Sequence, residues 1–87
     1  MTPKNQHQQV LYYLINWTKF SLKDVINDSM FYKFQTRLSD IENRCCCFIA
    51  NREKVDFTNR FGRKSNYNVY SACISKEKLI ELFEKYN

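Results

Sequence analysis

Apolar residues recur at three- and four-residue intervals in the middle of the chain. Phe31, Phe34, Leu38 and Ile41 follow this spacing, which places the four side chains on one face of a helix. The pattern predicts an amphipathic helix over about 30–44.

Two helices are predicted before it. The first has Thr2 as its N-cap, followed by a proline, and runs to about Trp17, since both residue types favour helix starts. After a short break at 18–20, Ser21 can cap a second, short helix, with Asp24 as a capping-box partner.

A last helix is predicted over about 75–86, with Ser75 as its N-cap. Its apolar stripe at helical spacing consists of Leu79, Leu82, Phe83 and Tyr86. Two uses of this stripe are open. It can pack on the domain, which a small chain needs for its core, or it can pair with a second copy in a homodimer.

Between the last two helices the pattern changes to that of strands. Cys45–Ala50 is a continuous apolar run too short for a globular helix, so we expect a buried strand. Residues 55–58 alternate as a half-buried strand does, and Asn59 with Gly62 predicts a turn that ends in a left-handed glycine. Together these features predict a β-hairpin over about 47–74.

The predicted order is helix, helix, helix, strand, strand, helix. With 87 residues, 44% of them hydrophobic, and one glycine and one proline, the chain suits a single small domain with few irregular stretches. We therefore predict an α+β fold of the winged helix-turn-helix kind over 1–87. It has three helices, a β-hairpin wing and an added C-terminal helix.

Positive charge is concentrated in the predicted hairpin. The chain has a net charge of +5, and residues 45–71 carry five basic and two acidic side chains. The predicted tip holds Arg60, Arg63 and Lys64. Such a patch indicates an anionic partner, either nucleic acid or an acidic protein surface.

The polar side of the third helix supplies the other candidate contacts. Arg37 could donate two hydrogen bonds to a guanine, and Gln35 could pair with an adenine. Tyr32, Lys33 and Thr36 could contact phosphates or bases. Asp40 is expected to pair with Arg37 or Arg44 on its own helix. The alternative is an ordinary solvated surface with no ligand.

The cysteines do not have the spacing of a metal site. Three are consecutive, Cys45–Cys47, and Cys73 stands alone, whereas zinc ligands come in separated pairs whose side chains converge. His7 has no partner one turn away. We expect no metal and no cofactor, and we expect the cysteines to be buried small apolar residues. A Cys47–Cys73 disulfide is geometrically possible but disfavoured in a cytosol.

Several further classes of protein are not expected. The polar N-terminus has no signal-peptide pattern, and no run approaches the roughly 18 apolar residues of a membrane span. We therefore expect a soluble, cytoplasmic protein without membrane contact. The chain shows no catalytic motif or clustered carboxylates, so an enzyme is not expected.

Three stretches resemble a known family: QVLYYLINWTKFSLKDVIND, RLSDIENR and NRFGRKSNYNVY. Over about 6–71 they are similar to small helix-turn-helix winged-helix proteins of phages and prophages. The matching positions are Gln9, Ser21, Arg37, Asp40, Ile41, Arg44, Asn59, Arg60, Phe61, Gly62, Tyr67 and Tyr70. Two departures are the replacement of the usual glycine after the third helix by Cys45–Cys47 and the added last helix.

The resemblance implies a small regulator of transcription that binds double-stranded DNA with a sequence preference, in the host cytoplasm if a phage encodes it. The alternative is a protein-binding module on the same fold. Such a module would inhibit or recruit a host factor, as anti-CRISPR proteins do, because a fold does not determine its function.

Overall fold

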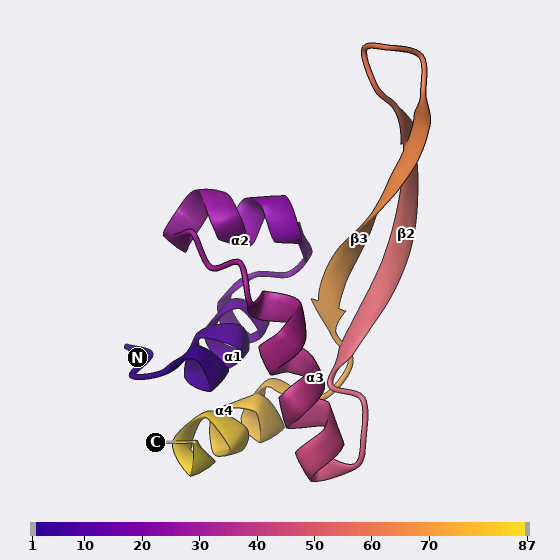
Figure 1. Cartoon of the computed structure of the whole chain (residues 1–87). Coiled ribbons are helices and arrows are strands. Elements are labelled where there is room, and N and C mark those ends of the chain that lie inside the picture. The colour runs from indigo at the N-terminus through magenta and orange to yellow at the C-terminus, as the bar shows by residue number, and fades with distance from the viewer. Residues whose placement is uncertain (1, 87) are drawn as a thin grey trace.

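Four helices and a three-stranded antiparallel sheet make up residues 2–86, which the computed structural model describes. The helices are α1 (Gln6–Asn16), α2 (Leu22–Ser29), α3 (Phe34–Cys45) and α4 (Lys76–Lys85). The strands are β1 (Phe20–Ser21), β2 (Ala50–Thr58) and β3 (Lys64–Ala72). The α+β class is thus confirmed, and the layout is compatible with a winged helix (Figure 1).

The sheet has the order β1-β3-β2. β2 and β3 pair along their whole length, from Ala50 opposite Ala72 to Thr58 opposite Lys64. β1 pairs with the C-terminal part of β3, where Phe20 lies opposite Tyr70 and Ser21 opposite Val69. The sequence predicted a break at 18–20, not a strand, because a two-residue strand has no periodicity of its own.

The β2–β3 hairpin extends well beyond the helices (Figure 1). The described chain measures 45 × 24 × 20 Å along its principal axes, and the hairpin accounts for the long dimension. Its first residues pack on the core, whereas its turn lies far from every helix (Figure 1). The hairpin therefore presents its tip to solvent on all sides.

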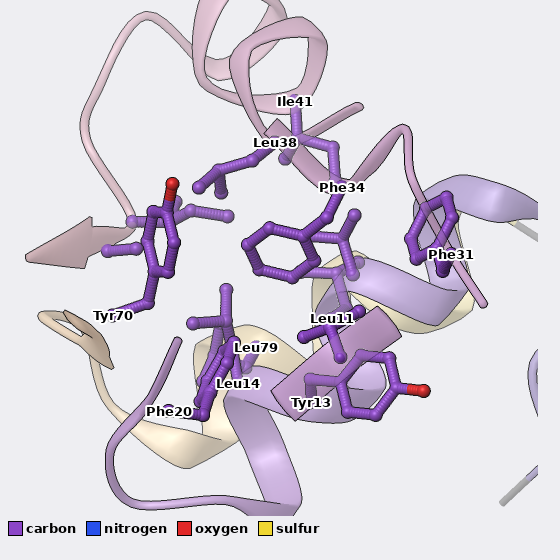
Figure 2. Packing of buried hydrophobic residues seen from close by; sticks show 14 of the residues in the cluster. Leu11, Tyr13, Leu14, Phe20, Phe31, Phe34, Leu38, Ile41, Tyr70 and Leu79 are labelled. Carbon is purple, nitrogen blue, oxygen red and sulfur yellow. The ribbon is translucent and has the colours of Figure 1, made fainter. Parts of the chain in front are cut away.

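Side chains from every helix and from the sheet form one core (Figure 2). Phe34, Leu38 and Ile41 of α3 are fully buried, as the apolar spacing predicted. The ring of Phe34 lies edge-on to Tyr70 of β3, with ring centroids 5.1 Å apart. Each buried side chain of this size contributes about 1.5–3 kcal/mol, so α3 is firmly fixed between α1 and the sheet.

The stripe of α4 packs inside the chain. Leu79 and Phe83 are buried, and Leu82 and Tyr86 pack partly against the same core. The side-chain amide of Gln8, itself buried, donates to the carbonyl oxygen of Phe83 at 2.8 Å. Of the two uses open for the stripe, packing on the domain is the one that the structure shows.

The predicted N-caps of two helices are confirmed, and the predicted N-cap of α1 is wrong. Ser21 and Asp24 form the complete capping box of α2, and Ser75 caps α4. α1, however, is capped by Asn5, whose side chain accepts a hydrogen bond from the amide of Gln8. Asn is an excellent N-cap, so the helix starts there and not at Thr2.

The third helix starts later than predicted, at Phe34 and not at about residue 30. Met30 adopts a left-handed conformation, with φ of 56°, and ends α2. Tyr32 and Lys33 therefore lie in the turn between the helices. Phe31 is nevertheless buried, so an apolar residue outside the helix extended the apparent periodicity.

The predicted strand over Cys45–Ala50 is wrong at every position except Ala50. Cys45 is the last residue of α3, and Cys46 follows in a left-handed conformation with φ of 55°. The amides of Cys46 and Cys47 both donate to the carbonyl of Glu42, which is the bonding of a helix end. The strand begins only at Ala50.

The cysteines are also more exposed than predicted. Cys46, Cys47 and Cys73 are exposed, and Cys45 is half-buried. All four are free thiols, and the Sγ atoms of Cys45 and Cys47 lie 3.3 Å apart. Among residues 2–86, no group of three or more His, Cys, Asp or Glu residues is placed to hold a metal ion. Over the same range, no helix is both long and apolar enough to cross a membrane.

Candidate nucleic-acid interface

The hairpin turn is closed by several hydrogen bonds although it lies far from the core. The Asn59 side chain accepts hydrogen bonds from the amides of Phe61 and Arg63, at 2.9 and 3.1 Å. The amide of Gly62 donates to the carbonyl of Asn59, and Gly62 has φ of 78°. This is the predicted turn with a left-handed glycine, and it fixes the backbone from which the tip side chains project.

Three cations project from this turn, and all are exposed: Arg60, Arg63 and Lys64. The guanidinium of Arg60 lies 4.7 Å from the centroid of the Phe61 ring, which is itself 75% exposed. None of the three cations makes a salt bridge among those found within residues 2–86. Their charge is therefore available to an external anion.

The two faces of the hairpin differ in character. Directly paired residues project to the same face, and the face of the buried Tyr70 is the one that meets α3 at the base. Continuing along it toward the tip are the pairs Lys54–Asn68, Asp56–Asn66 and Thr58–Lys64. The opposite face carries the pairs Glu53–Val69, Val55–Tyr67 and Phe57–Ser65. One face is thus polar, and the other is largely apolar.

An ion pair between an exposed arginine and a buried glutamate joins the base of the hairpin to α3. Arg52 of β2 donates to Glu42 of α3 at 2.6 Å, and the Glu42 side chain is only 7% exposed. This hydrogen bond raises the pKa of Arg52. Glu42 also accepts from the amide of Ile49 at 3.0 Å. A buried carboxylate with these partners holds the hairpin at a fixed angle to α3.

Gln35 strengthens the same connection. Its side-chain amide donates to the hydroxyl of Tyr70 at 2.7 Å, although Gln35 is an exposed residue. Gln35 therefore lies on the side of α3 that faces the hairpin, where a ligand between the two elements would meet it.

The solvent face of α3 is neutral. Thr36, Ser39 and Asn43 are exposed at helical spacing and define its centre. Thr36 was a predicted site residue, whereas Ser39 and Asn43 were not. Their signal was present in the sequence, since they lie opposite the Phe34–Leu38–Ile41 stripe on a helical wheel.

Arg37 lies on the flank of α3 and not at this centre. Its guanidinium donates to the side chain of Gln6 at 2.8 Å and to Asp40 at 3.1 Å. The predicted pairing of Asp40 with Arg37 is thus confirmed. Because both contacts are within the chain, Arg37 would have to break them before it could bind a base.

Tyr32 and Lys33 lie just ahead of α3. Both are exposed, Tyr32 to 64%, and Lys33 occupies the N-cap position without a side-chain cap bond. The predicted site residues thus form two groups, one at the start of α3 and one at the hairpin tip. The hairpin runs past the start of α3 and continues beyond it (Figure 1).

Comparison with known proteins places the chain in no group, because it matches no protein-family model and no curated protein sequence. The assignment of a function therefore depends on the geometry of these two groups.

Proposed function

We propose that this protein binds double-stranded DNA with a sequence preference, as a small winged-helix regulator. The observation that supports this best is the long hairpin with three exposed cations on a hydrogen-bonded turn. Cations contribute to DNA affinity by replacing counterions at phosphates. For this contribution the cationic side chains must be exposed and must reach the phosphates, but they need not be buried.

In this proposal the hairpin tip contacts the phosphate backbone. Nine-residue strands extend about 30 Å at 3.3 Å per residue, which carries Arg60, Arg63 and Lys64 clear of the helices. Lys54 and Lys64 lie on the face that continues from α3. Phosphate contacts of this kind set the position of a protein on the duplex.

The start and solvent face of α3 would then lie against the base edges. Asn43 has the side chain that pairs with adenine, and Thr36 and Ser39 can donate to or accept from most bases. Tyr32 and Lys33 would contact the adjacent backbone. With Arg37 held by Gln6 and Asp40, sequence preference would come mainly from short neutral side chains.

A charge placed at the centre of α3 tests this arrangement. Ser39→Glu should weaken binding to a short labelled duplex by about tenfold or more, because a carboxylate would approach phosphates in a groove. In Ser39→Gln the glutamine has the shape of glutamate without its charge, so this variant should bind within about twofold of wild type. Equal affinities for the two variants would show that α3 does not face the DNA.

A second candidate is a protein-binding module that inhibits or recruits a host factor. Phe61 favours it, since an aromatic ring stacked beneath Arg60 at an exposed tip suits an acidic protein surface with an apolar centre. Under this alternative, wild type would show no affinity for duplex DNA even at low salt.

A further inference from the structure

Two of the four cysteines lie in contact at the end of α3. The Sγ atoms of Cys45 and Cys47 are 3.3 Å apart, within hydrogen-bonding distance of a thiol. The other two thiols, Cys46 and Cys73, each donate to a backbone carbonyl oxygen instead. Among residues 2–86, only Cys45 and Cys47 therefore bring two sulfur atoms into contact.

The left-handed turn at Cys46 brings these two thiols together. In an extended strand, residues two positions apart are separated by about 6.6 Å along the chain. Here Cys46 has φ of 55°, and the amides of Cys46 and Cys47 both donate to the carbonyl of Glu42. This helix end folds Cys47 back toward α3, and the Cys45 Sγ lies 3.4 Å from the carbonyl oxygen of Cys47. The short distance between the sulfur atoms thus has its cause in the backbone.

The pair is accessible to reagents from solvent. Cys47 is exposed and Cys45 is half-buried, at the end of α3 that lies far from the hairpin tip (Figure 1). A disulfide has an S–S distance of about 2.05 Å, so the two sulfur atoms have to approach by about 1.3 Å. Small rotations about the two Cα–Cβ bonds give a movement of this size without a change in the backbone.

We propose that Cys45 and Cys47 form a reversible dithiol site, which low-molecular-weight disulfides such as oxidised glutathione convert to an intrachain disulfide. The bond closes a ring over the three residues Cys45–Cys47 only, so it adds little to the stability of the fold. Exposed disulfides are also readily reduced, and such bonds act in redox responses and not as structural links. The site is thus one of reversible modification, separate from the residues assigned to DNA.

Oxidation of the pair proceeds in two thiol–disulfide exchanges. In the first, one protein thiolate attacks a sulfur of oxidised glutathione, a mixed disulfide forms, and one glutathione thiolate leaves. In the second, the other protein thiolate attacks the protein sulfur of the mixed disulfide, and the second glutathione thiolate leaves. The two protein thiol protons pass through solvent to the two leaving thiolates. The two protein sulfur atoms are oxidised by two electrons in total, and the reagent is reduced to two thiols.

Proximity distinguishes this pair at the second exchange. The hydrogen bond with Cys45 raises the pKa of Cys47 and outweighs the positive charge of Lys78, which lowers that pKa. Cys47 is therefore no more reactive than an ordinary exposed thiol in the first exchange. The second exchange is intramolecular, and a thiol held beside the mixed disulfide reacts as if at very high concentration. We expect mixed disulfides at any exposed cysteine, with rapid conversion to a protein disulfide only at this pair.

Three double variants of the full chain, each with two cysteines left, test this proposal. Cys46→Ser combined with Cys73→Ser leaves the proposed pair. Cys45→Ser combined with Cys46→Ser leaves Cys47 and Cys73. Cys45→Ser combined with Cys73→Ser leaves the adjacent Cys46 and Cys47. Each variant is incubated with oxidised glutathione, and its intact mass is followed over time.

The variant that keeps Cys45 and Cys47 should lose the mass of two hydrogen atoms and remain a monomer. This loss should be at least about tenfold faster than in either control, because the two thiols are already in contact. The controls should accumulate the glutathione adduct instead. Equal rates of disulfide formation in the three variants, a lasting adduct on the proposed pair, or a disulfide-linked dimer would overturn the proposal.

The wild-type chain gives a second test that needs no serine variant to fold. Phenylarsine oxide bridges two neighbouring thiols, with one As–S bond to each and the loss of water. One equivalent should bind and protect Cys45 and Cys47 from alkylation, whereas Cys46 and Cys73 should still be alkylated, as located by fragmentation mass spectrometry. Protection of another pair, or alkylation of all four cysteines, would contradict the proposal. Neither test involves DNA, so a failure of the DNA-binding proposal would leave both outcomes unchanged.

Discussion

At the scale of single residues, Cys46 holds a backbone conformation that cysteine disfavours. It ends α3 with φ of 55°, where helices usually have a glycine because a Cβ atom is strained there. The run of cysteines was misinterpreted as a strand because it continues in apolar residues as far as Ala50. A non-glycine residue with positive φ cannot be recognised from hydrophobicity.

Replacement of this residue should stabilise the protein. Cys46→Gly relieves the left-handed strain and should raise the free energy of unfolding by about 1 kcal/mol, as measured by urea denaturation. Cys46→Ala keeps the Cβ atom and should change it by less than about 0.5 kcal/mol. If glycine and alanine have the same effect, the strain at Cys46 is negligible.

Because of the buried Tyr13, we expect the free energy of unfolding to fall at alkaline pH. It is buried, and its hydroxyl donates to Asp28 at 2.7 Å and lies 2.6 Å from the Ser29 hydroxyl. Burial raises the pKa of Tyr13 above its ordinary value, so the folded state favours the neutral phenol. The neutral phenol's contribution to the free energy of unfolding is complete below about pH 10, the pKa in the unfolded state. It is lost as the pH rises through the raised pKa of the folded state.

The measurement is urea denaturation at several values between about pH 8 and pH 11. The free energy of unfolding should fall above about pH 10 in wild type, and the fall should be smaller in Tyr13→Phe. Tyr32→Phe, an exposed control, should keep the wild-type profile. A profile that Tyr13→Phe leaves unchanged would contradict the role of burial at this hydroxyl.

At the scale of elements, local signals were the ones that the sequence analysis interpreted correctly. These signals form hydrogen bonds with residues no more than four positions away in the sequence. They are the capping box of Ser21 and Asp24, the N-cap Ser75, and the turn at Asn59 and Gly62. Their hydrogen bonds depend little on the rest of the fold, so their structures could be predicted without it.

Elements that depend on distant partners could not be predicted in this way. β1 exists because Phe20 pairs with Tyr70, fifty positions later in the sequence. The contacts of Arg37 with Gln6 and of Gln35 with Tyr70 are also long-range. The sequence therefore predicted α3 and the hairpin, but not which of their side chains already have partners within the chain.

The packing of α4 gives a prediction at this scale. Leu79 is 1% exposed in the common core, so Leu79→Ala should lower the free energy of unfolding by about 2–5 kcal/mol. Glu81→Ala, on the exposed side of the same helix, should have an effect below about 0.5 kcal/mol. Urea denaturation measures both, and equal effects would mean that α4 does not contribute to the core.

At the scale of the whole molecule, the distribution of charge and the shape of the chain coincide. The segment with the largest positive excess, 45–71, contains the hairpin that extends away from the helices (Figure 1). The polar face of that hairpin continues from α3, and the ion pair between Arg52 and the buried Glu42 links the two elements. These features together support the proposal of a two-part surface for a long anion.

The salt dependence of duplex binding tests this account most directly. Affinity of wild type for a random duplex should fall linearly with salt on logarithmic axes, because bound phosphates release counterions. Arg63→Ala should lower that slope by about one unit and weaken all duplex sequences about equally, since it removes one phosphate contact. Lys85→Ala on α4, far from the hairpin, should reproduce the wild-type slope. If wild type does not bind duplex DNA at low salt, or if both variants have the wild-type slope, the hairpin is not a DNA-binding element.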